Sequence, residues 1–157
     1  MKGKTEGMSV IVKTVACILT VPAYIFGLYI VIRGHLTPGG GFAGGAILAT
    51  LIAMLLVSFG RNLERGFRKE SLSVLEILGM SLFITLAFFG LSFTFFHNIL
   101  ANSGGLFGMS VEFGPNSGYL NTGGLIPVMN IAVGIEVFSA LSMIILLMLT
   151  GMKEEKK

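Results

Sequence analysis

Four long apolar runs, separated by stretches of glycine or charge, dominate this chain. They cover about residues 9–32, 42–59, 71–96 and 127–150. Each is close to the roughly 20 apolar residues that an α-helix needs to cross a bilayer. The pattern therefore predicts an all-α integral membrane protein, with four transmembrane helices in a single membrane domain that spans residues 1–157.

The composition supports this prediction. Of the 157 residues, 54% are hydrophobic and 12% are charged, whereas a soluble domain usually carries about 25% charged residues. The net charge of +3 comes from basic residues at the ends of the runs, which does not indicate a nucleic-acid partner. Cys17 is the single cysteine, so neither an internal disulfide nor a cysteine-ligated metal is expected.

The basic residues predict an orientation. Four spans place both tails and the central connector on one side, and that side carries most of the positive charge: Lys2, Lys4, Arg61, Arg65, Arg68, Lys69, Lys153, Lys156 and Lys157. The opposite side carries Arg33 alone. The positive-inside rule then places both termini in the cytoplasm. The glycine-rich connectors, 34–45 and about 101–124, are expected outside, with His35 and His97 at similar depth.

The first connector is not a typical flexible linker. It is unusually rich in glycine and lacks Ser, Lys and Glu: Gly34, His35, Leu36, Thr37, Pro38, Gly39, Gly40, Gly41, Phe42, Ala43, Gly44 and Gly45. Glycine lets backbones approach closely, so a built turn is expected here. Thr37 followed by Pro38 has the pattern of a helix N-cap with proline at the first helical position. In the second run, Gly45, Ala49 and Ala53 form a small-residue face suited to close helix packing.

Glu136 is the most informative side chain. It lies ten residues into the fourth run, or about 15 Å deep at about 1.5 Å per residue. An acid at mid-membrane is costly and suggests function, so Glu136 is a candidate to carry a proton or to coordinate sodium. A structural acid bonded across a helix interface is the alternative. Asn130, on the same helix but nearer the outside and on a different face, is a second ion-pathway candidate.

Glu76 and Lys13 are weaker ion-pathway candidates. Ser73 and Glu76 have capping-box spacing, which favours a structural role for Glu76 at a helix start. Lys13 is placed to snorkel to the headgroups, or to pair with Glu76 on the same side. His35 and His97, with Glu112 as the one acid on their side, make a poor metal site.

No pattern in the chain indicates catalysis. A phosphate-binding loop, a nucleophile with its base, and a haem or iron–sulfur ligand set are all missing from the sequence. The glycines at 39–41 and 44–45 follow no predicted strand, so they do not make a dinucleotide site. We therefore expect no enzyme, no cofactor and no metal.

Two motifs resemble a known family, the MnhB/MrpB family of small subunits in Mrp-type multisubunit sodium/proton antiporters. The segment 34–45 resembles that family's G-H-x-x-P-G-G-G-F-x-G-G signature, in which the matching residues are His35, Pro38, Gly39, Gly40, Gly41, Phe42, Gly44 and Gly45. The segment 130–137 resembles the N-x-x-V-G-x-x-V segment of the family's last helix. Length, four spans and motif order agree over nearly the whole chain.

The resemblance implies a small non-catalytic subunit in the cell membrane. It would work with a large antiporter-like subunit and several small ones. The same subunit type occurs in archaeal membrane-bound hydrogenase and its sulfur-reducing relative, so subunits of those complexes are possible partners, with membrane lipids around them. A subunit that only bridges modules is the alternative role. A free-standing four-helix drug exporter fits less well, because the first span has no acid and the chain has no tryptophan.

Overall fold

The computed structural model describes residues 8–60, 68–91, 93–101 and 123–154. These ranges hold four α-helices: α1 (Val10–Ile32), α2 (Gly40–Phe59), α4 (Lys69–Phe88) and α5 (Ile126–Glu154). Each is long and apolar enough to cross a membrane, which confirms the predicted all-α membrane protein. Most of the long connector at 101–124, the centre of the basic connector and the ends of both tails lie outside the described residues. The cytoplasmic orientation of the termini stays a prediction.

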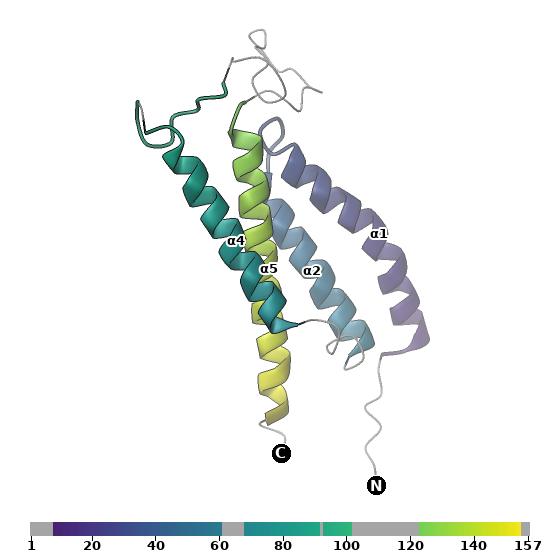
Figure 1. Ribbon diagram of the computed structural model, residues 1–157. Helices are drawn as coiled ribbons and strands as arrows, with labels where there is room; N and C mark the ends of the chain where they lie inside the picture. The colour runs from purple at the N-terminus through teal and green to yellow at the C-terminus, as the bar shows by residue number, and fades with distance from the viewer. Residues whose placement is uncertain (1–7, 61–67, 92, 102–122, 155–157) are drawn as a thin grey trace.

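The last helix of the chain is the centre of the bundle. α5 packs against α2 on one side and α4 on the other, while α1 packs mainly on α2. Figure 1 shows the resulting order α1, α2, α5, α4, with the start of α1 and the end of α5 at the same end of the molecule. α1 continues through Pro22 and leans away from α5 toward its N-terminal end (Figure 1).

The turn between α1 and α2 differs from its prediction. The Thr37 hydroxyl donates to the carbonyl oxygen of Arg33 at 3.1 Å, and the Thr37 amide donates to the same oxygen. Thr37 therefore closes the end of α1, and the prediction that it is the N-cap of α2 is wrong. α2 begins instead after Gly39, whose φ of 133° favours glycine, and no side chain caps it.

Glycines bring α2 and α5 into backbone contact. A Cβ added to Gly41 would overlap the carbonyl oxygen of Asn130, and one added to Gly45 would lie 2.7 Å from the carbonyl oxygen of Gly134. Ala49 continues the same face and is 1% exposed. The predicted small-residue face thus exists, and its partner is α5 of the same chain.

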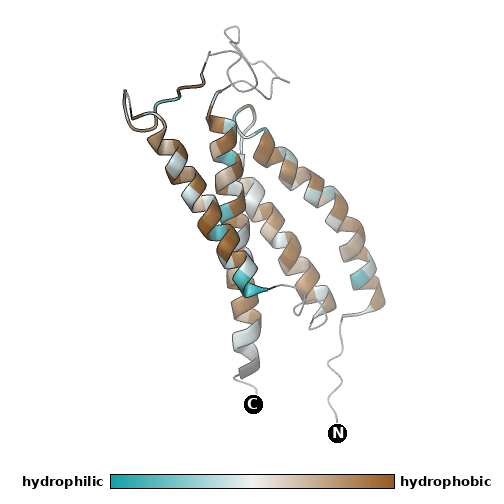
Figure 2. Cartoon of the chain, viewed as in Figure 1, coloured by the Kyte–Doolittle hydropathy of each residue, from teal (hydrophilic) through white to brown (hydrophobic). Residues whose placement is uncertain are grey.

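Larger side chains fill the other half of the bundle. Ile52 and Leu56 of α2, Leu72 of α4 and Leu146 of α5 form the apolar core there. Most of the outward surface of α1 and α4 is also apolar, and Figure 2 shows little hydrophilic colour along the helices. In a bilayer such faces contact lipid or neighbouring subunits.

The third helix is shorter than its apolar run. α4 ends at Phe88, whereas the run continues to Phe96. The chain then folds back, because the Phe96 amide donates to the carbonyl of Ala87 at 3.1 Å and Phe96 adopts φ 63°. Gly90 allows this reversal, since a Cβ on it would lie 2.7 Å from the His97 Cβ. Hydropathy alone does not separate this apolar turn from the helix before it.

Candidate functional site

Glu136 lies at the contact between α5 and α4. A Cβ on Gly79 of α4 would lie 2.9 Å from the Glu136 backbone nitrogen and 3.0 Å from its Cβ. The residues one turn away on this side of α5, Ala132 and Ser139, are 0% exposed. Glu136 itself is partly buried. Glu136 therefore lies where the backbones of α4 and α5 come very close, and its neighbour on this side is α4 rather than lipid.

Glu76 approaches the same contact from the other helix. α4 begins at Lys69, with Arg68 at its N-cap, so Ser73 lies inside the helix and the predicted capping box is wrong. Glu76 is three residues before Gly79 and four after the buried Leu72, and residues at these spacings share one helix face. That face is the one that packs on α5.

The two acids thus belong to one helix interface inside the predicted membrane. Glu136 lies about 15 Å along α5 from its start, and Glu76 about 10 Å along α4 from its own. The ion pair found within the described ranges is between Arg68 and Glu70, whose side chains are 76% and 84% exposed. It lies at the exposed start of α4 and does not involve either interface acid.

Asn130 and Lys13 lie elsewhere. A Cβ on Gly34 would be 2.8 Å from Asn130 Nδ2, so Asn130 faces the turn before α2 and not the α4 side. Lys13 is on α1, which packs on α2 and lies at the opposite edge of the bundle from α4 (Figure 1). The alternative in which Lys13 pairs with Glu76 is therefore wrong, and snorkelling of Lys13 to the headgroups stays a prediction.

Several nitrogen atoms near the turn between α1 and α2 are buried without a hydrogen-bond partner in the described part of the chain. They are Arg33 Nε, both ring nitrogens of His35, and Asn130 Nδ2. The Arg33 guanidinium carbon lies 5.2 Å from the centre of the Tyr29 ring. Among the described residues, no group of three or more His, Cys, Asp or Glu side chains is placed to hold a metal.

Asn98 has a structural role that the sequence did not reveal. Its Nδ2 donates to the carbonyl of Gly123 at 2.8 Å, and its Oδ1 accepts from the Leu125 amide at 2.9 Å. Gly123 also lies beside His35, since its added Cβ would be 3.4 Å from the imidazole Cδ2. Thus Asn98, not His97, ties the region after α4 to the start of α5. The sequence signal for this role is weak: asparagine side chains often form hydrogen bonds with the backbone in turns.

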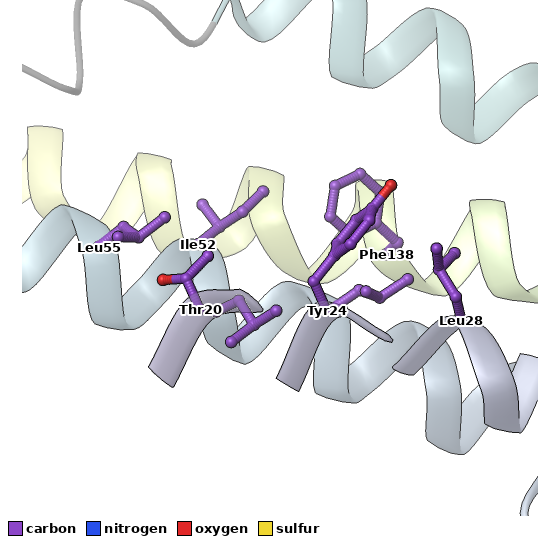
Figure 3. Close-up of a pocket in the computed structure, with 8 residues that line it drawn as sticks. Thr20, Tyr24, Leu28, Ile52, Leu55 and Phe138 are labelled. Atoms are coloured by element: carbon purple, nitrogen blue, oxygen red, sulfur yellow. The ribbon is translucent and has the colours of Figure 1, made fainter. Parts of the chain in front are cut away.

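A separate apolar groove lies between α1, α2 and α5. Its volume is about 340 Å³, and it is lined by Thr20, Tyr24, Leu28, Leu48, Leu51, Ile52, Leu55 and Phe138. In Figure 3, Tyr24 projects from α1 toward Phe138 of α5. This groove lies on the side of α5 that faces α1 and α2, whereas Glu136 meets Gly79 on the side that faces α4.

Comparison with known proteins identifies the family. Residues 11–143 match the model of a family described as a domain related to the MnhB subunit of Na⁺/H⁺ antiporter. An uncharacterised protein of Methanocaldococcus jannaschii is 34% identical over 132 residues, which are 84% of this chain and 49% of that protein. A Staphylococcus haemolyticus protein, named as a putative antiporter subunit of the mnhB2 type, is 32% identical over 91 residues, 55% of this chain and 64% of that one.

A solved structure has the same fold. It is a chain of the membrane-bound sulfane sulfur reductase, an archaeal respiratory membrane complex, with a TM-score of 0.73 and 34% identity over 94% of this chain and 60% of that one. The chain thus spans about half to two thirds of the length of these relatives. Because the family model covers most of the sequence and both predicted motifs lie within it, the chain is a multi-pass membrane protein of the MnhB family.

Proposed function

We propose that the chain is a membrane subunit of a sodium/proton antiporter module, and that Glu136 and Glu76 lie on its ion route. The observation that carries this proposal is the placement of two acids on one helix interface within candidate spans of an MnhB-family chain. The large antiporter-like subunit and the other small subunits of such modules are its partners. The chain itself contributes ion-binding groups rather than catalysis of a chemical reaction.

The chemistry of the interface supports a role in proton or sodium transfer. A carboxylate in low dielectric is costly unless it is protonated or paired with a cation. Glu136 has the buried small residues Ala132 and Ser139 one turn away, and its backbone and Cβ lie against Gly79 of α4. Glu76 lies one helical turn from Gly79 on the α4 side. A proton or a sodium ion held by one carboxylate therefore has a second acceptor along the same interface.

Exchange of each acid for its neutral amide tests the role of this interface. The complex containing Glu136→Gln is expected to assemble but to lose most of its sodium-driven proton movement, because an amide cannot take up a proton or pair with sodium as a carboxylate does. The rate is measured by dye fluorescence in inverted membrane vesicles. Glu76→Gln should lower the same rate. Glu70→Gln is the matched control, because Glu70 is 84% exposed at the start of α4 and its loss should leave transport unchanged.

Full assembly with normal sodium-dependent transport in Glu136→Gln would refute the role of Glu136. Native gel electrophoresis of the same membranes separates this result from a failure to assemble. A loss of transport in the control as well would show that removal of any acid from this subunit disturbs the complex, and the assignment of the interface would then fail.

A scaffold role is the second candidate function, and Phe42 favours it. The glycines around Phe42 pack inside the chain, yet its own side chain is 67% exposed at the start of α2. An exposed aromatic ring is a common anchor at protein interfaces. If the subunit serves only to bridge modules, Phe42→Ala weakens assembly on native gels, while Glu136→Gln affects neither assembly nor transport.

A further inference from the structure

We propose that the groove between α1, α2 and α5 binds one acyl chain of an anionic phospholipid, whose phosphate contacts Lys13. The proposal concerns a part of the molecule that the ion route does not use. It rests on the shape and chemistry of the groove, on its depth in the membrane, and on the position of the lysine.

The walls of the groove suit a hydrocarbon. Five of the lining residues are Leu or Ile and two are aromatic, and the Thr20 hydroxyl is already occupied by a hydrogen bond of 2.7 Å to the carbonyl of Ala16. A cavity with so few free polar groups does not hold ordered water. The groove is open at one side, because Tyr24 on its rim is 51% exposed. Lipid can therefore enter it from the bilayer.

The volume fits one chain and not a protein helix. A methylene group takes up about as much room as a water molecule, roughly 30 Å³, so 340 Å³ holds roughly eleven methylenes. The groove follows α1 from Thr20 to Leu28, a length of about 12 Å. A helix about 10 Å across would need roughly 900 Å³ over that length. An acyl chain is therefore the occupant that the space admits.

Lys13 marks the headgroup end. It precedes Ala16 by three residues and Thr20 by seven, and this spacing places all three on one side of α1. Lys13 is partly buried, and neither an ion pair nor a hydrogen bond of its ammonium is found in the described part of the chain. Its long stem lets the ammonium reach the phosphate level while its methylenes stay in contact with apolar surface.

The distances along α1 match a lipid. The groove begins about 10 Å from Lys13 and ends about 22 Å from it, and the hydrocarbon of one leaflet is about 15 Å thick. A chain that starts at the glycerol just above Lys13 therefore enters the end of the groove nearer to Lys13. Two other basic residues, Arg68 and Lys69 of α4, are engaged elsewhere, because Arg68 pairs with Glu70 and Lys69 donates to Thr150 of α5.

Native mass spectrometry of the full chain, purified from membranes in mild detergent with any subunits that accompany it, tests the proposal. The probes are dioleoyl phosphatidylglycerol and dioleoyl phosphatidylcholine. The unmodified chain should bind one phosphatidylglycerol about fivefold more tightly than phosphatidylcholine, the factor expected for one lysine at an anionic headgroup. Lys13→Gln should abolish this preference. Leu28→Trp, which fills the groove, should abolish the tight binding of both lipids.

Two matched controls accompany these variants. Lys69→Gln removes a lysine near the same end of the bundle but on α4, and Ile25→Trp adds the same ring on the outward side of α1, where Ile25 is 62% exposed. Both should bind lipid as the unmodified chain does. Equal affinity for the two lipids in the unmodified chain, or a preference that survives Lys13→Gln, would overturn the proposal. Lys13→Gln decides the headgroup contact even where Leu28→Trp fails to fold.

Discussion

The contact between α2 and α5 gives the sharpest prediction about stability. A methyl group at Gly41 would overlap the carbonyl oxygen of Asn130 and lie 2.9 Å from the nitrogen of Gly134. Nonbonded heavy atoms are comfortable at about 3.5–4.0 Å, so Gly41→Ala must separate the two helices locally by roughly 1 Å. No side chain can move aside to relieve the overlap, because the obstructing atoms belong to the backbone.

The expected cost follows from this geometry. Overpacking of a closely packed interior costs about 1–3 kcal/mol, and a rigid backbone contact favours the upper part of that range. Because alanine has a higher helix propensity than glycine, the substitution also stabilises α2 by up to about 1 kcal/mol. The net loss for Gly41→Ala is therefore about 2 kcal/mol, or roughly a thirtyfold change in the ratio of folded to unfolded protein.

The assay is the fraction of protein that stays monodisperse on size-exclusion chromatography after stepwise heating in detergent. Gly41→Ala should lose its folded peak several degrees below the unmodified protein. Gly151→Ala is the matched control, since a Cβ there meets nothing within 4 Å, and it should be neutral or slightly stabilising. If both variants melt together with the unmodified protein, α2 and α5 do not meet at Gly41 and the packing argument fails.

Two further substitutions test other parts of the bundle by the same assay. Asn98→Ala removes the two side-chain hydrogen bonds to residues 123–125. Because each contributes about 1 kcal/mol, the free energy of unfolding should fall by about 2 kcal/mol. An unchanged melting temperature would show that α5 starts correctly without these bonds. Leu146→Ala should lower the free energy of unfolding by about 2 kcal/mol, because Leu146 is 1% exposed in the core and its removal leaves a cavity. Leu147→Ala is the control and should have little effect, because Leu147 is 49% exposed. Equal losses in the two variants would contradict the assigned core.

The four spans are predictable from the sequence because membrane helices are recognised by length and hydropathy. The close packing around Gly45 is predictable too, since small residues at every fourth position have few other uses in a helix. The end of α4 is not, because apolar residues continue past Phe88 into a turn. The order of the helices is also invisible in the sequence, because hydropathy says nothing about which face meets which helix.

The candidate site is predictable only in part. The depth of Glu136 in its span is enough to single it out, and the structure places it on a helix interface. The spacing of Ser73 and Glu76 suggests a capping box, but α4 begins four residues before that serine. Local patterns of this kind depend on where the helix starts, which is the least certain feature of a sequence. The contact of Glu76 with the interface requires knowledge of which face of α4 packs on α5.

The central position of α5 has a consequence for how the chain is made. α5 leaves the ribosome after α1, α2 and α4, yet α4 packs chiefly against it. α1 and α2 can pair as soon as they enter the membrane, whereas α4 must wait in the bilayer or beside the insertion machinery with Glu76 uncovered. The interface that holds both acids therefore forms only after α5 has entered the membrane, and a chain truncated before α5 would leave α4 without its partner.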